Sequence, residues 1–118
     1  MATSTISSMK SQIDAWEEVT ISFPNTASDT QYSKAYVNNV TNEFYFHMYV
    51  TFANGLGKGG TICWVPEPKD SSFDFVAVDF ITGNCSYMPV YYLNGQIKPR
   101  SDIAAGHTIM MLARYLLA

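Results

Sequence analysis

Charged residues are scarce in this sequence of 118 residues. Asp, Glu, Lys and Arg together make up 14% of it, whereas they form about 25% of an average soluble domain. The seven Lys and Arg residues are scattered singly, the formal net charge is −3 and the pI is about 5.1. A nucleic-acid-binding surface needs clustered basic side chains. We therefore expect no nucleic-acid partner.

Long apolar runs are also missing. No stretch approaches the roughly 20 consecutive apolar residues that a helix needs to cross a bilayer, and the N-terminus lacks the apolar core of a secretory signal peptide. We expect a soluble chain without membrane insertion, which is not secreted by the standard route. A length of 118 residues suits one domain that folds without a metal or a disulfide.

Cysteine is rare too. Cys63 and Cys85 stand 22 residues apart, with no CxxC pair and no His near them in the sequence. Metal ligation requires more closely clustered ligands. Both residues lie in apolar, strand-like stretches, which favours two buried free thiols, and a disulfide is the alternative. We expect neither a bound metal nor a cofactor.

The sequence contains no recognisable catalytic motif. It has two His residues and no Gly-x-Ser-x-Gly turn. The Gly-rich stretch at 55–60 lacks the Gly-Lys-Ser/Thr ending of a phosphate-binding loop. Four acidic residues could supply a glycosidase pair, but nothing in the pattern selects two of them: Glu67, Asp70, Asp74 and Asp79. We expect a protein that is not an enzyme, with a small polysaccharide hydrolase as an alternative.

The first residues follow a helical period. Apolar side chains recur at spacings of three and four, which predicts a short N-terminal α-helix over residues 1–17. The stripe consists of Ile6, Met9, Ile13 and Trp16. A helix this short needs a surface to pack on. It could lie across its own domain, or it could begin a coiled coil that joins copies of the chain, because the stripe also fits a heptad.

After residue 17 the period changes to two. The clearest case is the stretch 43–53, where Phe44 begins an apolar face and Tyr45 begins the opposite one. Apolar stretches recur about every 8–12 residues with turn residues between them, which is typical of a sandwich or barrel. Asn94-Gly95 is a strong hairpin signal, and Pro89 indicates an edge strand or a bulge. We predict an all-β domain over residues 18–118, an antiparallel β-sandwich of about eight strands, jelly-roll-like.

The most apolar run, at 107–118, allows two interpretations. As a helix it has one apolar side, and as a strand it is apolar on both faces. The periodicity leaves both open, and we take the run as the last strand of the sandwich. The residues turned into the core are then Ile109, Met111, Ala113 and Tyr115. The opposite face would need a neighbouring sheet or subunit to cover it.

Aromatic residues are abundant, with eight Tyr, seven Phe and two Trp. Tyr and Trp rings stack on the apolar faces of sugars, and their polar atoms can bond to sugar hydroxyls. The alternative is that these rings fill the core or a subunit interface. The candidate saccharide-binding residues are Tyr45, His47, Tyr49, Trp64, Asp79, Tyr91 and Tyr92.

The end of the chain, residues 94–118, resembles the ending of the C-terminal head domains of tailed-bacteriophage receptor-binding and baseplate (tail fibre) proteins. Such domains often close with a Gly-x-Ile strand, a short linker, Ile-x-x-Gly, and a last strand that finishes in an aromatic and small apolar residues. The positions that match are Gly95, Ile97, Ile103, Gly106 and Tyr115.

The resemblance implies a homotrimeric β-sandwich head domain of a phage virion, at the tail tip or baseplate. It would recognise a saccharide on the host cell surface, without catalysis or a cofactor, and would contact other tail proteins. Residues 1–17 would lead to a stalk. The candidate oligomer-interface residues are Ile6, Met9, Ile13, Trp16, Met110, Leu112 and Leu116. The alternative is a structural virion module, or a trimerisation domain, without a ligand of its own.

Overall fold

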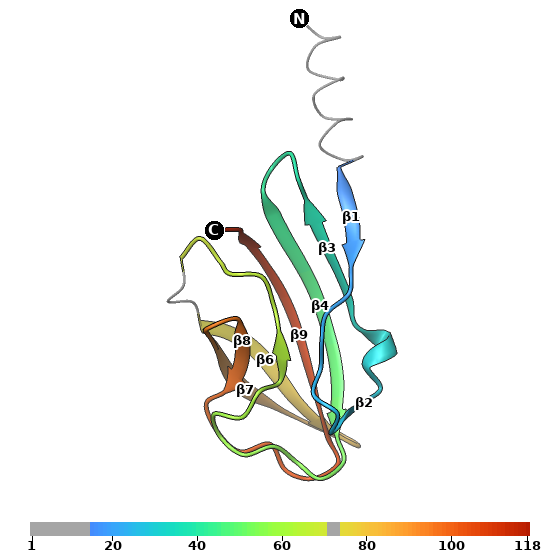
Figure 1. Cartoon of the computed structure of the whole chain (residues 1–118). Coiled ribbons are helices and arrows are strands. Elements are labelled where there is room, and N and C mark those ends of the chain that lie inside the picture. The colour runs from blue at the N-terminus through green and yellow to red at the C-terminus, as the bar shows by residue number, and fades with distance from the viewer. Residues whose placement is uncertain (1–14, 71–73) are drawn as a thin grey trace, which may run out of the picture.

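A computed structural model describes residues 15–70 and 74–118, and these residues form an all-β, antiparallel fold (Figure 1). Nine strands and one short 3-10 helix, η1, make up this part of the chain. The strands are β1 (Trp16–Val19), β2 (Ala27–Ser28), β3 (Lys34–Asn38), β4 (Glu43–Phe52), β5 (Cys63–Trp64), β6 (Asp74–Ile81), β7 (Asn84–Leu93), β8 (Gln96–Pro99) and β9 (His107–Leu116), and η1 is Thr30–Tyr32.

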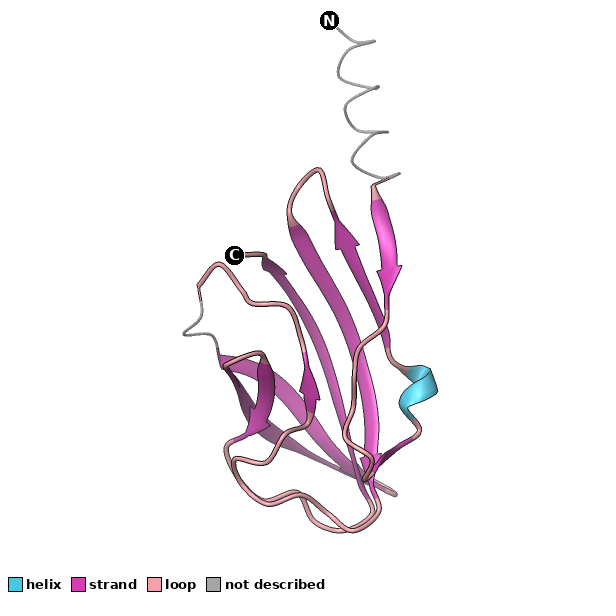
Figure 2. Ribbon diagram, in the orientation of Figure 1, coloured by secondary structure: helices cyan, strands magenta, loops and turns pink. Residues whose placement is uncertain are grey.

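The strands belong to one continuous curled sheet and not to the two separate sheets of the predicted jelly-roll-like sandwich. Their order is β1-β3-β4-β9-β6-β7-β8-β5, with β2 paired to β4. The curl brings β5 and β8 over the face of the central strands (Figure 2). The backbone N–H of Trp64 in β5 donates to the carbonyl of Ser22, at 3.0 Å, just after β1. The two ends of the sheet therefore meet, as in a partly closed barrel.

The pairing of β4 with β9 forms the centre of the sheet. Ten pairs of residues face each other, from Glu43 opposite Leu116 to Phe52 opposite His107. Because side chains alternate along a strand, every second residue of both strands points into the core. The inward residues are Phe44, Phe46, Met48, Val50 and Phe52 of β4, and Ile109, Met111, Ala113 and Tyr115 of β9, all buried. The run at 107–118 is thus a strand, with the predicted residues inward.

The curl encloses the core. Aromatic rings pack closely at one end of it, where the centroids of Phe44 and Tyr115 lie 5.0 Å apart. Apolar residues from the strands and loops at the other end of the sheet cover the inward faces of β4 and β9. These covering residues are Ile62, Val65, Met88, Val90, Ile97 and Ile103, all buried.

The end of β9 is held on both sides. The N–H of Leu117 donates to the carbonyl of Asn42 at 2.8 Å, and the N–H of Lys69 donates to the carbonyl of Leu116 at 2.8 Å. The hydroxyl of Tyr115 donates to the carbonyl of Pro66 at 2.6 Å. Burial raises the pKa of the Tyr115 phenol, so the hydroxyl remains a donor. The connector between β5 and β6 is thereby fastened to the last strand.

Among the turns that contain residues with positive φ, two show why the sequence needs Asn or Gly there. Asn94 (φ 49°) and Gly95 (φ 85°) join β7 to β8 in the two-residue hairpin that their sequence predicts. At Gly55 (φ 74°) a Cβ atom would lie 2.6 Å from the carbonyl oxygen of Ile103. Only glycine therefore lets the loop after β4 run beside the loop before β9, where Leu56 and Ile103 exchange two backbone hydrogen bonds.

Pro89 lies within β7, which is not an edge strand of the sheet as a whole. The strand pairs with β6 over its whole length, but β8 pairs only with its second half, from Val90 onward. The carbonyl of Pro89 accepts the N–H of Arg100 at 3.0 Å. Pro89 thus lies just beyond the end of the β7–β8 pairing. The N–H that proline lacks is not needed there for a hydrogen bond between the strands.

The N-terminal helix predicted over residues 1–17 falls mostly outside the described residues, and so do Ile6, Met9 and Ile13 of its stripe. Trp16 is an exception and corrects the prediction, because it begins β1 and faces Asn38 of β3. The strand begins before residue 18, where we expected the β domain to start. The spacing of apolar residues by three and four extends to Trp16 and therefore predicted a helix there. The structure instead has a strand at this position, with two polar residues, Glu17 and Glu18, at its centre.

The two cysteines are free, and they differ in exposure. Cys63 is buried, whereas Cys85 is exposed, which corrects the expectation of two buried thiols. Cys85 lies beside the turn that joins β6 and β7, opposite Phe80. Burial strongly raises the pKa of the Cys63 thiol, and a thiol reacts as its thiolate.

We expect one thiol to react in the folded protein and two after unfolding. Titration with an aromatic disulfide reagent at about pH 8 should detect Cys85 alone, because Cys63 is neither accessible nor ionised. The Cys85→Ala variant should give almost no native reaction, and Cys63→Ala should react like the parent. Two rapidly reacting thiols in the folded parent would contradict the burial of Cys63.

The two faces of β4 should differ in their contribution to stability. Phe46→Ala empties a fully buried position and should lower the free energy of unfolding by about 3–5 kcal/mol. Tyr45→Ala, one residue away on the opposite face, should cost about 1 kcal/mol. Urea denaturation of both variants measures the difference, and equal losses would mean that the faces are assigned wrongly.

Candidate functional site

Tyrosine side chains gather on the outer face of β3 and β4. Tyr36 and Tyr45 face each other across the two strands, with ring centroids 6.2 Å apart. Tyr49 contacts Tyr32 of η1 edge-on at 5.4 Å. We call these four side chains the tyrosine strip. Of the predicted saccharide-binding residues, the fold brings Tyr45, His47 and Tyr49 together on this face, while Tyr32 and Tyr36 were not predicted.

A serine holds η1 against β4. The hydroxyl of Ser33 donates to the carbonyl of Tyr49 and accepts the N–H of the same residue, both at 2.9 Å. This pair of bonds takes the place of a strand neighbour at that point of β4. It fixes the position of Tyr32, which is 58% exposed, beside the ring of Tyr49.

A groove of about 340 Å³ opens next to the strip, between β1 with the residues that follow it and the η1–β3 segment. Its walls are mainly polar, and an ion pair between Lys34 and Glu18, at 3.3 Å, lies in it. The lining residues are Glu18, Val19, Thr20, Ile21, Phe23, Thr30, Gln31, Ser33, Lys34 and Ala35. No pattern in the sequence predicts this groove, because it forms only when β1 and η1 approach β3.

A charged pair stands at one end of the strip. The Nε of Arg114 donates to the Oε2 of Glu43 at 2.7 Å, and its guanidinium lies 5.6 Å from the ring centroid of Trp16. Arg114 also faces Tyr45 across the β4–β9 pair. The hydrogen bond with Arg114 lowers the pKa of the Glu43 carboxyl, and Glu43 in turn raises the pKa of Arg114. Both groups thus stay charged beside the rings.

The other predicted saccharide-binding residues lie elsewhere. Tyr91 is on the outer face of β7. The guanidinium of Arg100 lies over its ring, with the Cζ atom 4.4 Å from the ring centroid. Trp64 is part of β5 and is 43% exposed. Tyr92 points inward and lines a hollow of about 410 Å³ whose other residues are Glu67, Leu93, Asn94 and Gly95. The fold therefore does not join these aromatic side chains to the tyrosine strip.

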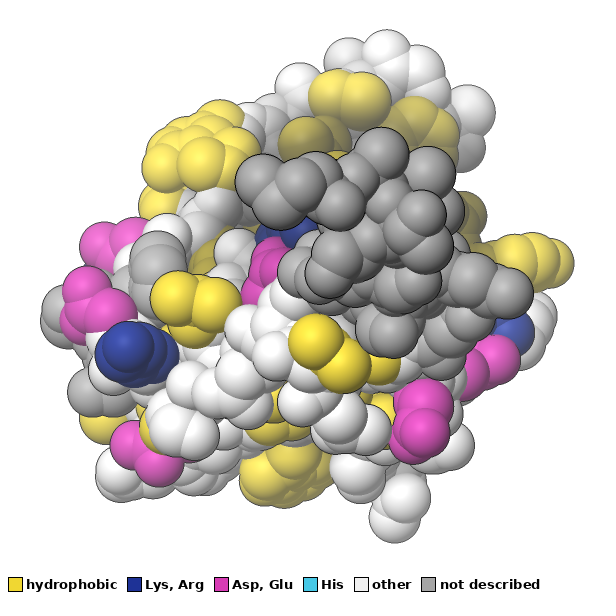
Figure 3. All heavy atoms as spheres, turned by 90° about the horizontal axis from the view of Figure 1, so that it is seen from above, with side chains coloured by type: hydrophobic (Ala, Val, Ile, Leu, Met, Phe, Trp, Pro, Cys, Tyr) yellow, Lys and Arg dark blue, Asp and Glu magenta, His cyan; other side chains and the backbone are white. Residues whose placement is uncertain are grey.

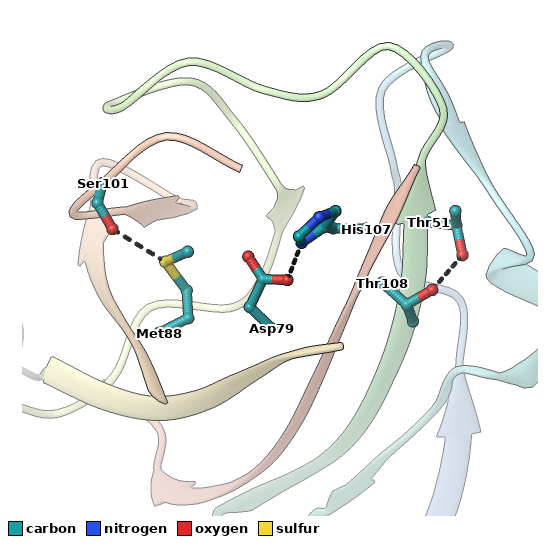
Figure 4. Close-up of polar contacts among 6 residues, drawn as sticks. All are labelled: Thr51, Asp79, Met88, Ser101, His107 and Thr108. Carbon is teal, nitrogen blue, oxygen red and sulfur yellow. Dashed lines mark hydrogen bonds and ion pairs between the residues drawn. The ribbon is translucent and has the colours of Figure 1, made fainter. Parts of the chain in front are cut away.

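Asp79 of β6 pairs with His107, the first residue of β9. Its Oδ1 lies 2.5 Å from the Nδ1 of His107, and the two side chains are mostly buried (Figure 4). Beside them, the hydroxyls of Thr51 and Thr108 share a hydrogen bond of 2.8 Å across β4 and β9. These contacts connect β6 to β9 and β4, and they place Asp79 away from the tyrosine strip.

Within the described part of the chain, no three His, Cys, Asp or Glu side chains come close enough together to hold a metal ion. Over residues 15–70 and 74–118 there is also no helix with the length and apolarity needed to cross a membrane. Seen from the end at which β1 begins, charged side chains stand in small groups and not in one field of a single sign (Figure 3).

Comparison with known proteins gives one informative likeness. No family model matches the sequence, and no curated protein matches it either. Among solved structures, the fold resembles the head domain of the lactococcal phage bIL170, described as a receptor-binding domain. The TM-score is 0.64 at 13% sequence identity, over 86% of this chain and 98% of that domain. The chain thus has the fold of a phage receptor-binding head domain, in agreement with the family resemblance of its sequence.

The Glu43–Arg114 pair should make stability depend on pH in the acid range. Because the pKa of Glu43 is lowered in the folded state, the ionised pair stabilises the fold above the ordinary carboxyl pKa of about 4.3. That stabilisation is lost as the pH falls through the lowered pKa. Between about pH 7 and about pH 3, the parent should therefore lose more free energy of unfolding than Glu43→Gln.

Urea denaturation at both pH values measures this difference. Glu17→Gln removes an exposed carboxyl from β1, opposite Val37, and serves as the control. An equal loss of stability in the parent and in Glu43→Gln would show that the pair does not act in this way.

Proposed function

We propose that this protein is a receptor-binding head domain of a tailed phage, which recognises a saccharide on the host cell surface without catalysis. The observation that carries the proposal is the likeness in fold to the bIL170 head domain, which covers 86% of this chain and 98% of that one. The two sequences are only 13% identical, so the ligand has to be argued from the side chains of this chain.

The tyrosine strip with its adjoining groove is the proposed saccharide site. Tyr32 is exposed and the other three rings of the strip are half-buried. Such rings offer flat apolar surfaces for sugar rings, and their hydroxyls both donate and accept hydrogen bonds. Next to them stand Arg114 and Glu43, held in a fixed pair, and the exposed ring of His47. In the groove, hydroxyl and amide groups from Thr30 and Gln31 add the uncharged polar contacts that a neutral sugar needs.

The hollow beside Tyr92 is a second place for a sugar unit. It combines an inward-facing tyrosine with the carboxyl of Glu67 and the amide of Asn94. Leu93, which is 48% exposed, contributes an apolar wall. Because it lies apart from the strip, the hollow would bind a separate sugar unit.

The assembly proposed with this function is a homotrimer in the virion tail, in contact with other tail or baseplate proteins. Its support is the low charge of the chain together with exposed apolar side chains on β9, namely Leu112 and Leu116. Met110, the third candidate of that strand, is half-buried, and Trp16 lies under Arg114 on the outer face of β1.

Loss of a ring from the strip should weaken saccharide binding. A glycan array identifies a ligand, and calorimetry then compares the parent with Tyr49→Ala and Tyr49→Phe. Removing the ring should raise the dissociation constant about tenfold or more, which corresponds to roughly 1.4 kcal/mol. Tyr49→Phe keeps the ring and should have a smaller effect, equal to the contribution of the hydroxyl.

Val40→Ala, at an exposed turn between β3 and β4, is the matched control and should bind like the parent. Unchanged affinity in Tyr49→Ala would remove the strip from the site, and the same experiment with Tyr92→Phe would then test the hollow. Absence of binding to any glycan, in a folded and assembled protein, would favour a structural virion module.

A further inference from the structure

The sequence contains two Asn-Gly pairs, Asn54-Gly55 and Asn94-Gly95, and the fold holds them differently. In such a pair the backbone nitrogen of the glycine can attack the asparagine side chain with little hindrance, because glycine has no side chain of its own. Both asparagines lie in turns and are exposed. The two pairs therefore differ in what surrounds the glycine, and not in the access of water to the amide.

The nitrogen of Gly55 is engaged in the fold. Its N–H donates to the carbonyl of Phe52 at 3.0 Å. The next residue, Leu56, exchanges two backbone hydrogen bonds with Ile103, at 2.9 and 2.8 Å. The backbone of Gly55 also packs so closely on the loop before β9 that a Cβ would lie 2.6 Å from the carbonyl oxygen of Ile103. The nitrogen can turn toward the side chain of Asn54 only if this whole contact opens.

The nitrogen of Gly95 is free of such contacts. Its N–H has no acceptor among the residues that the structure describes, and only its carbonyl is bonded, accepting the N–H of Val65 at 2.9 Å. A Cβ on Gly95 would meet nothing within 4 Å. One terminal strand pair, Leu93 opposite Gln96, closes the hairpin at this end. The ends of strand pairs open at little cost in free energy, so residue 94 can leave its left-handed conformation and bring the reacting atoms together.

We propose that Asn94 is a site of spontaneous modification, at which the side-chain amide becomes a carboxyl in the folded protein. The nitrogen of Gly95 loses its proton to water or hydroxide and attacks the Cγ of Asn94. A C–N bond forms, the side-chain nitrogen leaves as ammonia, and a cyclic imide remains. Water then opens the imide at one of its two carbonyls and gives aspartate or isoaspartate. Water is the only co-reactant, and nothing is oxidised or reduced.

The modification changes the hollow beside Tyr92. Asn94 and Glu67 both line this hollow, so a second carboxyl replaces a neutral amide, and the hollow repels an anionic ligand more strongly. Aspartate keeps the backbone and tolerates the left-handed conformation of residue 94 (φ 49°). Isoaspartate adds a methylene group to the main chain of a two-residue turn, and this displaces the carbonyl of Gly95 from Val65. The inference goes beyond the proposed function, since the reaction needs neither a sugar nor a partner.

The test follows the loss of amide from both pairs in one sample of the folded full chain. The protein is incubated at mildly alkaline pH, because the reaction begins with the loss of a proton, and tryptic peptides are then analysed by tandem mass spectrometry. Lys58 and Lys69 lie between the two pairs, so Asn54 and Asn94 fall in different peptides. Asn94 should lose its amide about five- to tenfold faster than Asn54, the factor that corresponds to one hydrogen bond.

Two controls connect the difference to the fold and to the residue. In concentrated urea the contacts of both glycines are lost, and the two pairs should react at similar rates. The Asn94→Asp variant has no amide to lose at this position. It should have the circular dichroism spectrum of the parent and show no mass change at the hairpin. Isoaspartyl methyltransferase should label the incubated parent and label this variant much less.

Equal rates at Asn54 and Asn94 in the folded protein, or a faster reaction at Asn54, would overturn the inference. So would an Asn94 that keeps its amide in the folded protein while both pairs react in urea. These outcomes are separable from those of the saccharide experiment, because none of them changes the rings of the tyrosine strip. A protein that binds no glycan would leave the modification site standing.

Discussion

The ten-residue pairing of β4 with β9 is the constraint on which the rest of the structure depends. Because side chains alternate strictly, one choice of register decides both faces at once. It turns Phe44, Phe46 and their partners into the core, and it puts Tyr45, Tyr49 and Leu112 outside. A slip of one residue would expose the phenylalanines and bury the tyrosines. The core and the tyrosine strip on the opposite face therefore depend on the same ladder of hydrogen bonds.

Much of this ladder could be predicted from the sequence. The alternation at 43–53, the Asn94-Gly95 hairpin and the inward residues of the last strand are local patterns, and they appear in the structure as expected. The order of the strands could not be predicted, since β9 lies between β4 and β6 and not beside β8. Nor could the exposure of Cys85, because the first half of β7 pairs with β6 alone, and this depends on where β8 ends.

The candidate site was predictable only where it lies on one strand. Tyr45, His47 and Tyr49 share a face of β4 and could be grouped by their spacing of two. Tyr32 reaches the same face through η1 and the bonds of Ser33, which no pattern of apolar residues announces. Conversely, Tyr91 and Tyr92 are neighbours in sequence and point to opposite sides of the sheet. Aromatic content alone therefore indicated an aromatic surface without locating it.

The direction of β1 has a mechanical consequence. The strand runs along the same axis as β3 and β4, and its first residue, Trp16, stands at the end of the sheet where the last strand also ends (Figure 1). A pull on Trp16 along that axis would load the four β1–β3 residue pairs in shear, all of them together. A pull across the axis would instead open them one after another. The domain should thus withstand tension along its strands better than a sideways force.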